Sequence, residues 1–257
     1  MENRIITESA KKMREIARTA LQGKWKAMFI GILIYYVFSG VIPAVLDMFF
    51  SSVQYVTLAT GDVIPMEVTY ASPVYSFILS GPLMLGILMF LLAFFRKHTI
   101  DYALTFEGFS MLGKGFLLFL VYSVRIFLWS LLFVIPGLIA AFRYSQAFYL
   151  RIDHPEWTAN QCLAASSRLM KGNKMKLLGM NLSFIGWYIL ATLPATIIGA
   201  FVTAEVATLV VTIVLSIPVL FVDLYLMMTE TVFYEILVGN LIVREQSPFD
   251  EFNSNQF

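Results

Sequence analysis

The sequence predicts an all-α protein, specifically a polytopic membrane helix bundle with about six transmembrane helices. Of its 257 residues, 59% are hydrophobic and 14% are charged, whereas soluble domains carry about 25% charged residues. The mean hydropathy is +0.77. Apolar runs recur along the chain, and about 20 apolar residues suffice for a helix to cross the ~30 Å hydrocarbon core. The lipid bilayer is therefore the expected partner.

Other functional classes find little support in the sequence. The formal net charge is +1, so nothing indicates a nucleic-acid partner. The single cysteine, Cys162, excludes an intramolecular disulfide and a cysteine-based metal cluster, and we expect it to be a small packing residue. His98 and His154 lack the spacing of zinc motifs, and no G-x-S-x-G nucleophile motif is present. We expect no enzyme activity, no cofactor and no metal site.

The membrane domain is expected to cover residues 27–238. Its six predicted spans lie at about 27–50, 73–95, 116–135, 137–152, 177–200 and 206–228. The first span is too long for the apolar part of a cleavable signal and is interpreted as a signal anchor. The stretch 116–150 is ambiguous, because it fits either one long tilted helix or a hairpin of two shorter helices.

The distribution of basic residues decides between these alternatives. Sixteen of the eighteen Lys and Arg residues lie in four segments, namely 1–26, 96–115, 151–176 and the tail after Val238. The predicted outer loops 51–72 and 201–205 contain none. The positive-inside rule places the basic segments and both termini in the cytoplasm. An even number of crossings must then separate 96–115 from 151–176, so a hairpin is predicted, with its turn at Pro136 and Gly137.

Several segments are predicted outside the bilayer. Residues 1–26 form a cytoplasmic or interfacial amphipathic helix, which either only leads into the first span or also binds lipid or a partner. The outer loop 51–72 alternates β-branched and aromatic residues around Thr60-Gly61-Asp62, which indicates a short β-hairpin. Residues 96–115 are interpreted as an interfacial or re-entrant loop.

A cytoplasmic helix is predicted over 153–172. Asp153 followed by Glu156 resembles a capping box at its start, and Gly172 provides its end. We expect this helix to dock on the bundle with Trp157 and Met170 at least half buried. Residues 239–257 are expected to form a cytoplasmic tail.

Four charged residues, Asp47, Arg125, Arg143 and Asp223, are predicted at membrane depth and form the candidate site. Such charges cost at least ~2.5–3.5 kcal/mol at a helix centre and usually face a partner or a wet cavity. They indicate either a polar path for an ion, solute or headgroup, or buried salt bridges that set helix register. Counting residues along the predicted spans pairs Arg143 with Asp47 and Arg125 with Asp223.

Several strings together resemble one known family. They are Leu21–Trp25 (LQGKW), Gly81–Gly86 (GPLMLG), Ile135–Ser145 (IPGLIAAFRYS), Asp153–Pro155 (DHP), Ser167–Gly172 (SRLMKG), Ser183–Trp187 (SFIGW) and Phe233–Glu235 (FYE). The chain is similar, from about Arg14 to Leu237, to integral membrane proteins, mostly from Firmicutes, known as domain of unknown function 975. The resemblance implies a multi-pass protein of a bacterial plasma membrane and carries over no catalytic or binding residue.

Two functions are therefore expected as alternatives. The first is transport or permeation of a small solute, ion or lipid. The second is a non-transporting scaffold, or an accessory or regulatory subunit, that acts through the cytoplasmic helix and the N-terminus with a protein partner or as a homo-oligomer. A continuous, water-filled cavity that reaches Arg125 or Arg143 favours transport, whereas dry and fully paired charges favour the scaffold.

Overall fold

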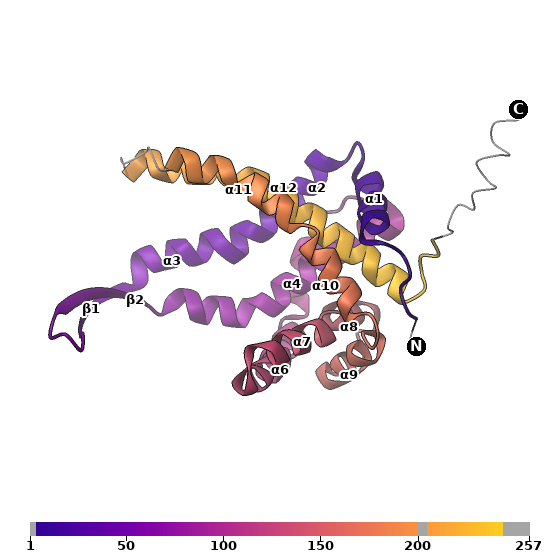
Figure 1. The fold of residues 1–257 in the computed structure, drawn as a ribbon, viewed down its shortest axis with the longest axis horizontal. Helices are drawn as coiled ribbons and strands as arrows, with labels where there is room; N and C mark the ends of the chain where they lie inside the picture. Colours follow the sequence, from indigo (N-terminus) through magenta and orange to yellow (C-terminus); the bar gives the residue numbers. More distant parts are fainter. Residues whose placement is uncertain (1–3, 200–204, 244–257) are drawn as a thin grey trace, which may run out of the picture.

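The computed structural model describes residues 4–199 and 205–243. It confirms the all-α class, since helices form the bundle and one two-stranded sheet forms the only strand pairing in these ranges (Figure 1). The elements are α1 (Ala10–Leu21), α2 (Trp25–Tyr36), η1 (Val37–Val41), α3 (Ile42–Phe50), β1 (Ser51–Thr57), β2 (Val63–Thr69), α4 (Ala71–Lys97), α5 (Leu104–Ser110), α6 (Leu112–Leu132), α7 (Val134–Tyr144), α8 (Ala147–Asp153), α9 (Ala159–Leu169), α10 (Lys174–Leu182), α11 (Ile185–Gly199) and α12 (Glu205–Leu237). The predicted loop residues 201–204 lie outside the described ranges.

The first apolar run forms one continuous helical rod of α2, η1 and α3. Its middle widens into a π-helical turn, in which the Ile42 N–H donates to the Val37 carbonyl. Pro43 explains this turn, because proline lacks an N–H and its ring clashes with the carbonyl four residues earlier in a regular α-helix. The Tyr75 hydroxyl donates to the Phe38 carbonyl at 2.9 Å, so α4 satisfies part of the widened turn.

The predicted outer β-hairpin is confirmed. β1 and β2 pair antiparallel, with Ser51 opposite Thr69 and Thr57 opposite Val63. Gly61 has φ +88° in the connecting turn, a conformation that glycine adopts without steric cost. Most hairpin side chains are exposed, so the sheet projects from the helices.

Glycines bring α4, α5 and α6 unusually close together. A Cβ on Gly108 of α5 would overlap the carbonyl oxygen of Pro82 in the middle of α4, and one on Gly86 would overlap that of Thr105. A Cβ on Gly81 would likewise overlap the carbonyl of Gly115 in α6. The segment after α4 therefore folds back along α4, and the interfacial or re-entrant placement of 96–115 stays a prediction.

The predicted hairpin between residues 116 and 150 is present as α6 and α7, which pack on each other. Its predicted turn at Pro136 and Gly137 is wrong, because the chain reverses at Phe133, whose backbone is extended at φ −167° and ψ 161°. Pro136 instead lies in the first turn of α7, where a missing N–H costs no helical hydrogen bond. Gly137 allows α7 to approach α6, since a Cβ there would overlap Ser130 Oγ.

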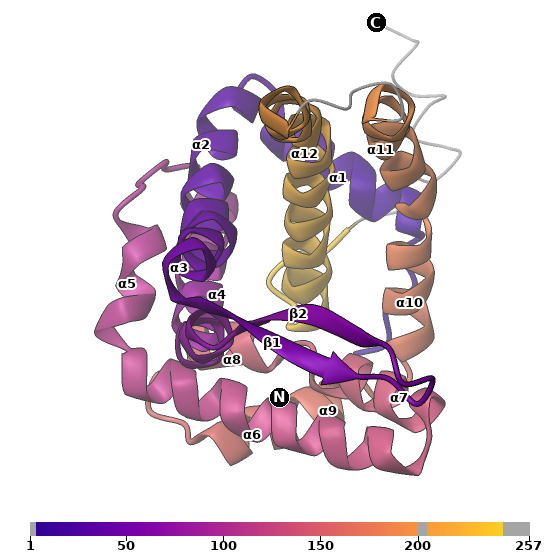
Figure 2. The same ribbon diagram turned by 90° about the vertical axis from the view of Figure 1, so that its left-hand side faces the viewer.

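Five helical segments are long and apolar enough to cross a membrane, and they are Trp25–Phe50, Ala71–Lys97, Leu112–Leu132, Lys174–Ile198 and Ser216–Leu237. The predicted fourth span, 137–152, is not among them, because a turn at Ser145 and Gln146 divides it into α7 and α8. Figures 1 and 2 also show that α6 runs across α4 rather than along it. The number of crossings thus stays a prediction, and five candidate spans indicate a multi-pass membrane protein.

The amphipathic N-terminal helix is present as α1, capped by Ser9. It packs on α12 through a buried side formed by Met13, Ala17 and Leu21. The Tyr225 hydroxyl of α12 donates to the Arg14 carbonyl at 2.9 Å. The helix is therefore an integral part of the bundle rather than only a lead into the first span.

The predicted cytoplasmic helix is present as α9, but its predicted start is wrong. The capping box is Thr158 with Gln161, not Asp153 with Glu156, and Asp153 ends α8. Gly172 follows the helix end with φ +89°. Met170 is fully buried and Trp157 is partly buried, which confirms that the segment docks on the bundle.

The helices converge at one end of the molecule and diverge toward the other. Figure 1 shows α1, the N-terminal segment and the chain after α12 at one end, and β1 and β2 at the opposite end. The buried core lies toward the convergent end, where α4, α8, α9 and the second half of α12 meet. The N-terminal segment, α1 and the residues that directly follow α12 thus lie opposite the β-hairpin, and the side of the membrane on which each segment lies stays a prediction.

Candidate functional site

The structure does not bring the four predicted charged residues together as two ion pairs. Asp223 of α12 accepts hydrogen bonds from the Tyr36 hydroxyl of α2 at 2.5 Å and from the Tyr188 hydroxyl of α11. The predicted partner Arg125 is elsewhere, so the Arg125–Asp223 pairing is wrong. Asp223 instead ties α2, α11 and α12 together through two tyrosines.

Asp47 of α3 does not pair with Arg143 either. Its Oδ1 is buried and has no hydrogen-bond partner among the described side chains. The expected Arg143–Asp47 pairing is therefore wrong, because α3 and α7 belong to different parts of the bundle (Figure 2).

Both arginines that the sequence predicts at membrane depth lie on the α6–α7 hairpin and contact aromatic rings across it. The Arg125 guanidinium of α6 lies 5.6 Å from the ring centroid of Tyr144 in α7. The Arg143 guanidinium of α7 lies 5.8 Å from the ring centroid of Trp129 in α6. These two cation–π contacts follow from the antiparallel packing of the hairpin, and each stabilises a desolvated cation by about 0.5–2 kcal/mol.

The two arginines differ in their polar partners. Arg125 Nη2 donates to Asn160 Oδ1 of α9 at 2.8 Å, so Arg125 joins the hairpin to the docked helix. Among the described side chains, Arg143 has no carboxylate partner and its guanidinium makes no hydrogen bond. Its guanidinium instead makes the cation–π contact with the Trp129 ring.

A cavity of about 250 Å³ lies at Arg143 between α6 and α7. Its other lining residues are Trp129, Pro136, Ile139 and Ala140. The walls are thus apolar, and one unpaired guanidinium supplies the charge. Next to it, the hairpin tip exposes Phe133, Val134 and Ile135, each by more than 70%. A site of this kind fits an anionic group attached to an apolar chain.

A cluster that the sequence interpretation missed joins α4, α8 and α12 at the convergent end. We call Arg96, Asp153, Tyr234, Glu235 and Asn240 the Arg96 cluster. Arg96 forks onto Asp153 with N–O distances of 2.6 and 2.9 Å and also contacts Glu235 Oε1 at 2.6 and 2.8 Å. Tyr234 donates to Asp153 at 2.6 Å, and Asn240 donates to Glu235 at 3.0 Å. Each carboxylate is therefore satisfied, which is typical of a structural tie.

The signal for this cluster was present but incomplete in the sequence. Arg96 follows a span, and Asp153 and Glu235 occur in the strings that resemble the family. Nothing in the sequence shows that positions 139 residues apart meet.

Among all described residues, no group of three or more His, Cys, Asp or Glu is arranged to hold a metal. Cys162 is fully buried in α9, and burial raises the pKa of its thiol.

The Arg96 cluster predicts an acid-sensitive step in stability. Burial raises the pKa of Asp153, but hydrogen bonds from Arg96 and Tyr234 and the positive charge of Arg96 lower it more, so the pKa lies below its usual 3.8. A lowered folded-state pKa contributes stability above the unfolded-state pKa and loses it as the pH falls through the folded-state value. We expect the melting temperature to decrease when the pH is lowered below about 4. In the Asp153→Asn variant, this decrease should be smaller, because residue 153 can no longer be protonated. An exposed control, Asp62→Asn, should follow the unmodified protein; an equal effect of both variants would contradict the assignment.

The fold and its five candidate spans define the class, an α-helical multi-pass membrane protein. Residues 131–240 match the sequence profile of a family described as "Protein of unknown function (DUF975)". The matched family is the one that the sequence resembles, and the match extends from the end of α6 to just beyond α12. That region includes Arg143, Asp153 and Glu235, whereas the strings around Trp25 and Gly81 precede it. No curated protein and no solved structure matches the chain.

Proposed function

We propose that the protein transports or admits an anionic amphiphile, meaning a lipid or lipid-like solute with a phosphate or carboxylate headgroup. The single observation that carries this proposal is the cavity in which Arg143 meets apolar walls without a counter-ion. It narrows the wider expectation of a small solute, ion or lipid to a ligand that matches both the charge and the apolar lining.

The chemistry of Arg143 supports an oxyanion ligand. A guanidinium is planar, stays charged, and offers paired N–H donors that match a carboxylate or phosphate. A ligand bound there would supply the hydrogen bonds that no described side chain supplies. The Trp129 ring keeps the side chain in place while its donors remain unused.

The surroundings support an apolar chain on the same ligand. Ile139 and Trp129 line the cavity and are themselves 46% and 40% exposed. Only Gly115 and Leu118 of α6 are buried, so most of this helix presents apolar side chains outward. An acyl chain lying along the hairpin would cover that surface without leaving the hydrocarbon phase.

The test is leaflet exchange in proteoliposomes. A phosphatidylglycerol with a fluorescent acyl chain should exchange between leaflets faster when the protein is present, as measured by dithionite quenching of the outer leaflet. Arg143→Gln should reduce this acceleration by about ten-fold or more, because hydrogen bonds to a charged group contribute about 1.5–3 kcal/mol. Arg125→Gln is the matched control, because Arg125 already binds Asn160, and it should change exchange by less than about two-fold.

The outcomes distinguish transport from the alternative function, an accessory or regulatory subunit. Equal exchange of a phosphatidylcholine probe, or no effect of Arg143→Gln, would contradict the proposed ligand. Arg143-dependent binding of phosphatidylglycerol without exchange would favour an accessory or regulatory subunit. The exposed apolar residues of α11, such as Ile189 and Leu190, support this second function. Another membrane protein would cover them in place of lipid.

A further inference from the structure

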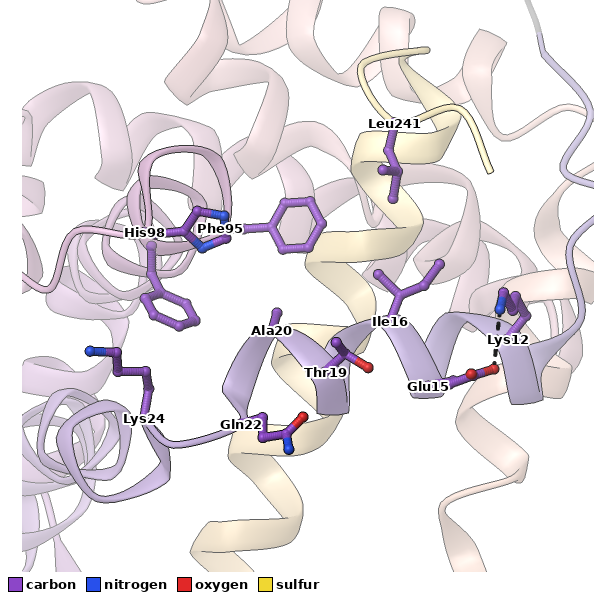
Figure 3. Close-up of a pocket in the computed structure, with 11 residues that line it drawn as sticks. Lys12, Glu15, Ile16, Thr19, Ala20, Gln22, Lys24, Phe95, His98 and Leu241 are labelled. Carbon is purple, nitrogen blue, oxygen red and sulfur yellow. Dashed lines mark hydrogen bonds and ion pairs between the residues drawn. The ribbon is translucent and has the colours of Figure 1, made fainter. Parts of the chain in front are cut away.

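A second and larger hollow lies at the convergent end, away from the α6–α7 hairpin. It is a groove of about 640 Å³ between α1, the end of α4 and the chain that follows α12. Figure 3 shows α1 side chains such as Ile16 and Ala20 on one side, Phe95 and His98 on another, and Leu241 at the end. The groove has an apolar floor, and none of the contacts described above fills it.

The rim of the groove carries an excess of positive charge. Lys12 and Lys24 both line it. Lys12 pairs with the single acidic lining residue, Glu15, at 3.3 Å. Within the described residues, Lys24 has no ion pair, and His98 also lines the groove (Figure 3). An occupant that fits this groove is therefore apolar or aromatic and carries negative charge near Lys24.

The sequence contains a segment of this composition shortly after Leu241, which lines the groove. Residues 244–257 read REQSPFDEFNSNQF and contain three phenylalanines and three acidic residues against one arginine. The described chain ends at Val243, two residues after Leu241, which lines the groove. Phe249 follows Leu241 by eight residues, which span at most about 28 Å when extended, so the segment easily reaches the floor.

We infer that residues 249–252 of this segment dock in the groove as an intramolecular peptide. Phe249 and Phe252 enter the apolar floor beside Ile16 and Phe95, and the intervening Asp250 and Glu251 face Lys24. A short tether gives such a segment an effective concentration in the millimolar range, which favours it over a free peptide of equal composition. The docked segment joins α1 to the end of α4, immediately next to Arg96.

Site-specific photocross-linking of the full-length protein in phosphatidylcholine–phosphatidylglycerol nanodiscs tests this inference. With the photoreactive residue benzoylphenylalanine in place of Phe249 or Phe252, irradiation should give intramolecular cross-links to peptides containing residues 12–24 or 94–98, identified by mass spectrometry. Cross-links to lipid, to a second copy of the chain, or to no peptide of the groove would each overturn the inference.

Charge variants provide a second readout that does not depend on the packing of the core. Lys24→Glu should lower the cross-link yield about five-fold or more, whereas Lys11→Glu, an equal charge change on an exposed α1 position outside the groove lining, should leave it within about two-fold. Combining Lys24→Glu with Asp250→Lys and Glu251→Lys should restore the yield. Equal yields from Lys24→Glu and Lys11→Glu would overturn the inference.

Discussion

Replacing Arg96 by alanine is expected to lower the free energy of unfolding by about 3 kcal/mol. The substitution removes the cation shared by Asp153 and Glu235 and leaves the Glu235 carboxylate, whose side chain is 3% exposed, without its ion pair. Breaking a buried pair on one side costs about 3–5 kcal/mol, because an uncompensated charge remains. The lower end applies here because the Arg96 side chain itself is 31% exposed.

Unfolding by sodium dodecyl sulfate in mixed micelles, followed by helicity, measures this effect. Arg96→Lys should retain part of the stability, since an ammonium group cannot fork onto two carboxylates as a guanidinium does. Lys97→Ala removes the neighbouring exposed charge and should change stability by no more than about 0.5 kcal/mol. If Arg96→Ala were as stable as Lys97→Ala, the Arg96 cluster would not be the tie between α4, α8 and α12.

Replacing Gly108 by alanine is expected to destabilise the protein by about 2–3 kcal/mol. The new Cβ would overlap the Pro82 carbonyl oxygen, and a backbone group cannot swing aside as a flexible side chain can. The helix α5 must then move away from α4, which also disturbs the neighbouring contact of Gly86 with Thr105.

The control substitution is expected to have the opposite effect on stability. A Cβ on Gly113, near the start of α6, meets no atom within 4 Å. Because alanine favours a helix over glycine by about 0.5–1 kcal/mol, Gly113→Ala should be neutral or stabilising in the same unfolding experiment. Destabilisation of similar size at both positions would mean that close packing on α4 does not explain the effect.

Most of the features that the sequence predicted correctly depend on local pattern, and one depends on the distribution of charge along the chain. The length of the apolar runs predicted the helix bundle, and alternation around Gly61 predicted the outer β-hairpin. The distribution of basic residues predicted the α6–α7 hairpin. The start of α9 was mistaken because two capping signatures lie five residues apart, at Asp153 and at Thr158. Only the fold distinguishes them, since Arg96 and Tyr234 engage Asp153.

The polar partners depend on contacts that no local pattern contains. Tyr36 reaches Asp223 across 187 positions, and Arg96 reaches Glu235 across 139. The depth argument that paired Arg125 with Asp223 assumed that α6 runs along the other spans. The close approach of Gly81 and Gly115 allows α6 to cross α4 instead (Figure 2), so residue counting along the chain gave the wrong neighbours. The role of Arg143 as a site residue stays a prediction.

The most direct measurement of the central claim is photocross-linking of a lipid to the Arg143 cavity. Purified protein in nanodiscs would be irradiated with phosphatidylglycerol carrying a diazirine near the start of one acyl chain, and phosphatidylcholine with the same chain would be the reference probe. We expect adducts on the segment 129–143 from the anionic probe, and a loss of about ten-fold or more in Arg143→Gln but not in Arg125→Gln. Equal labelling of that segment by both probes, or labelling that persists in Arg143→Gln, would contradict an anionic headgroup at Arg143.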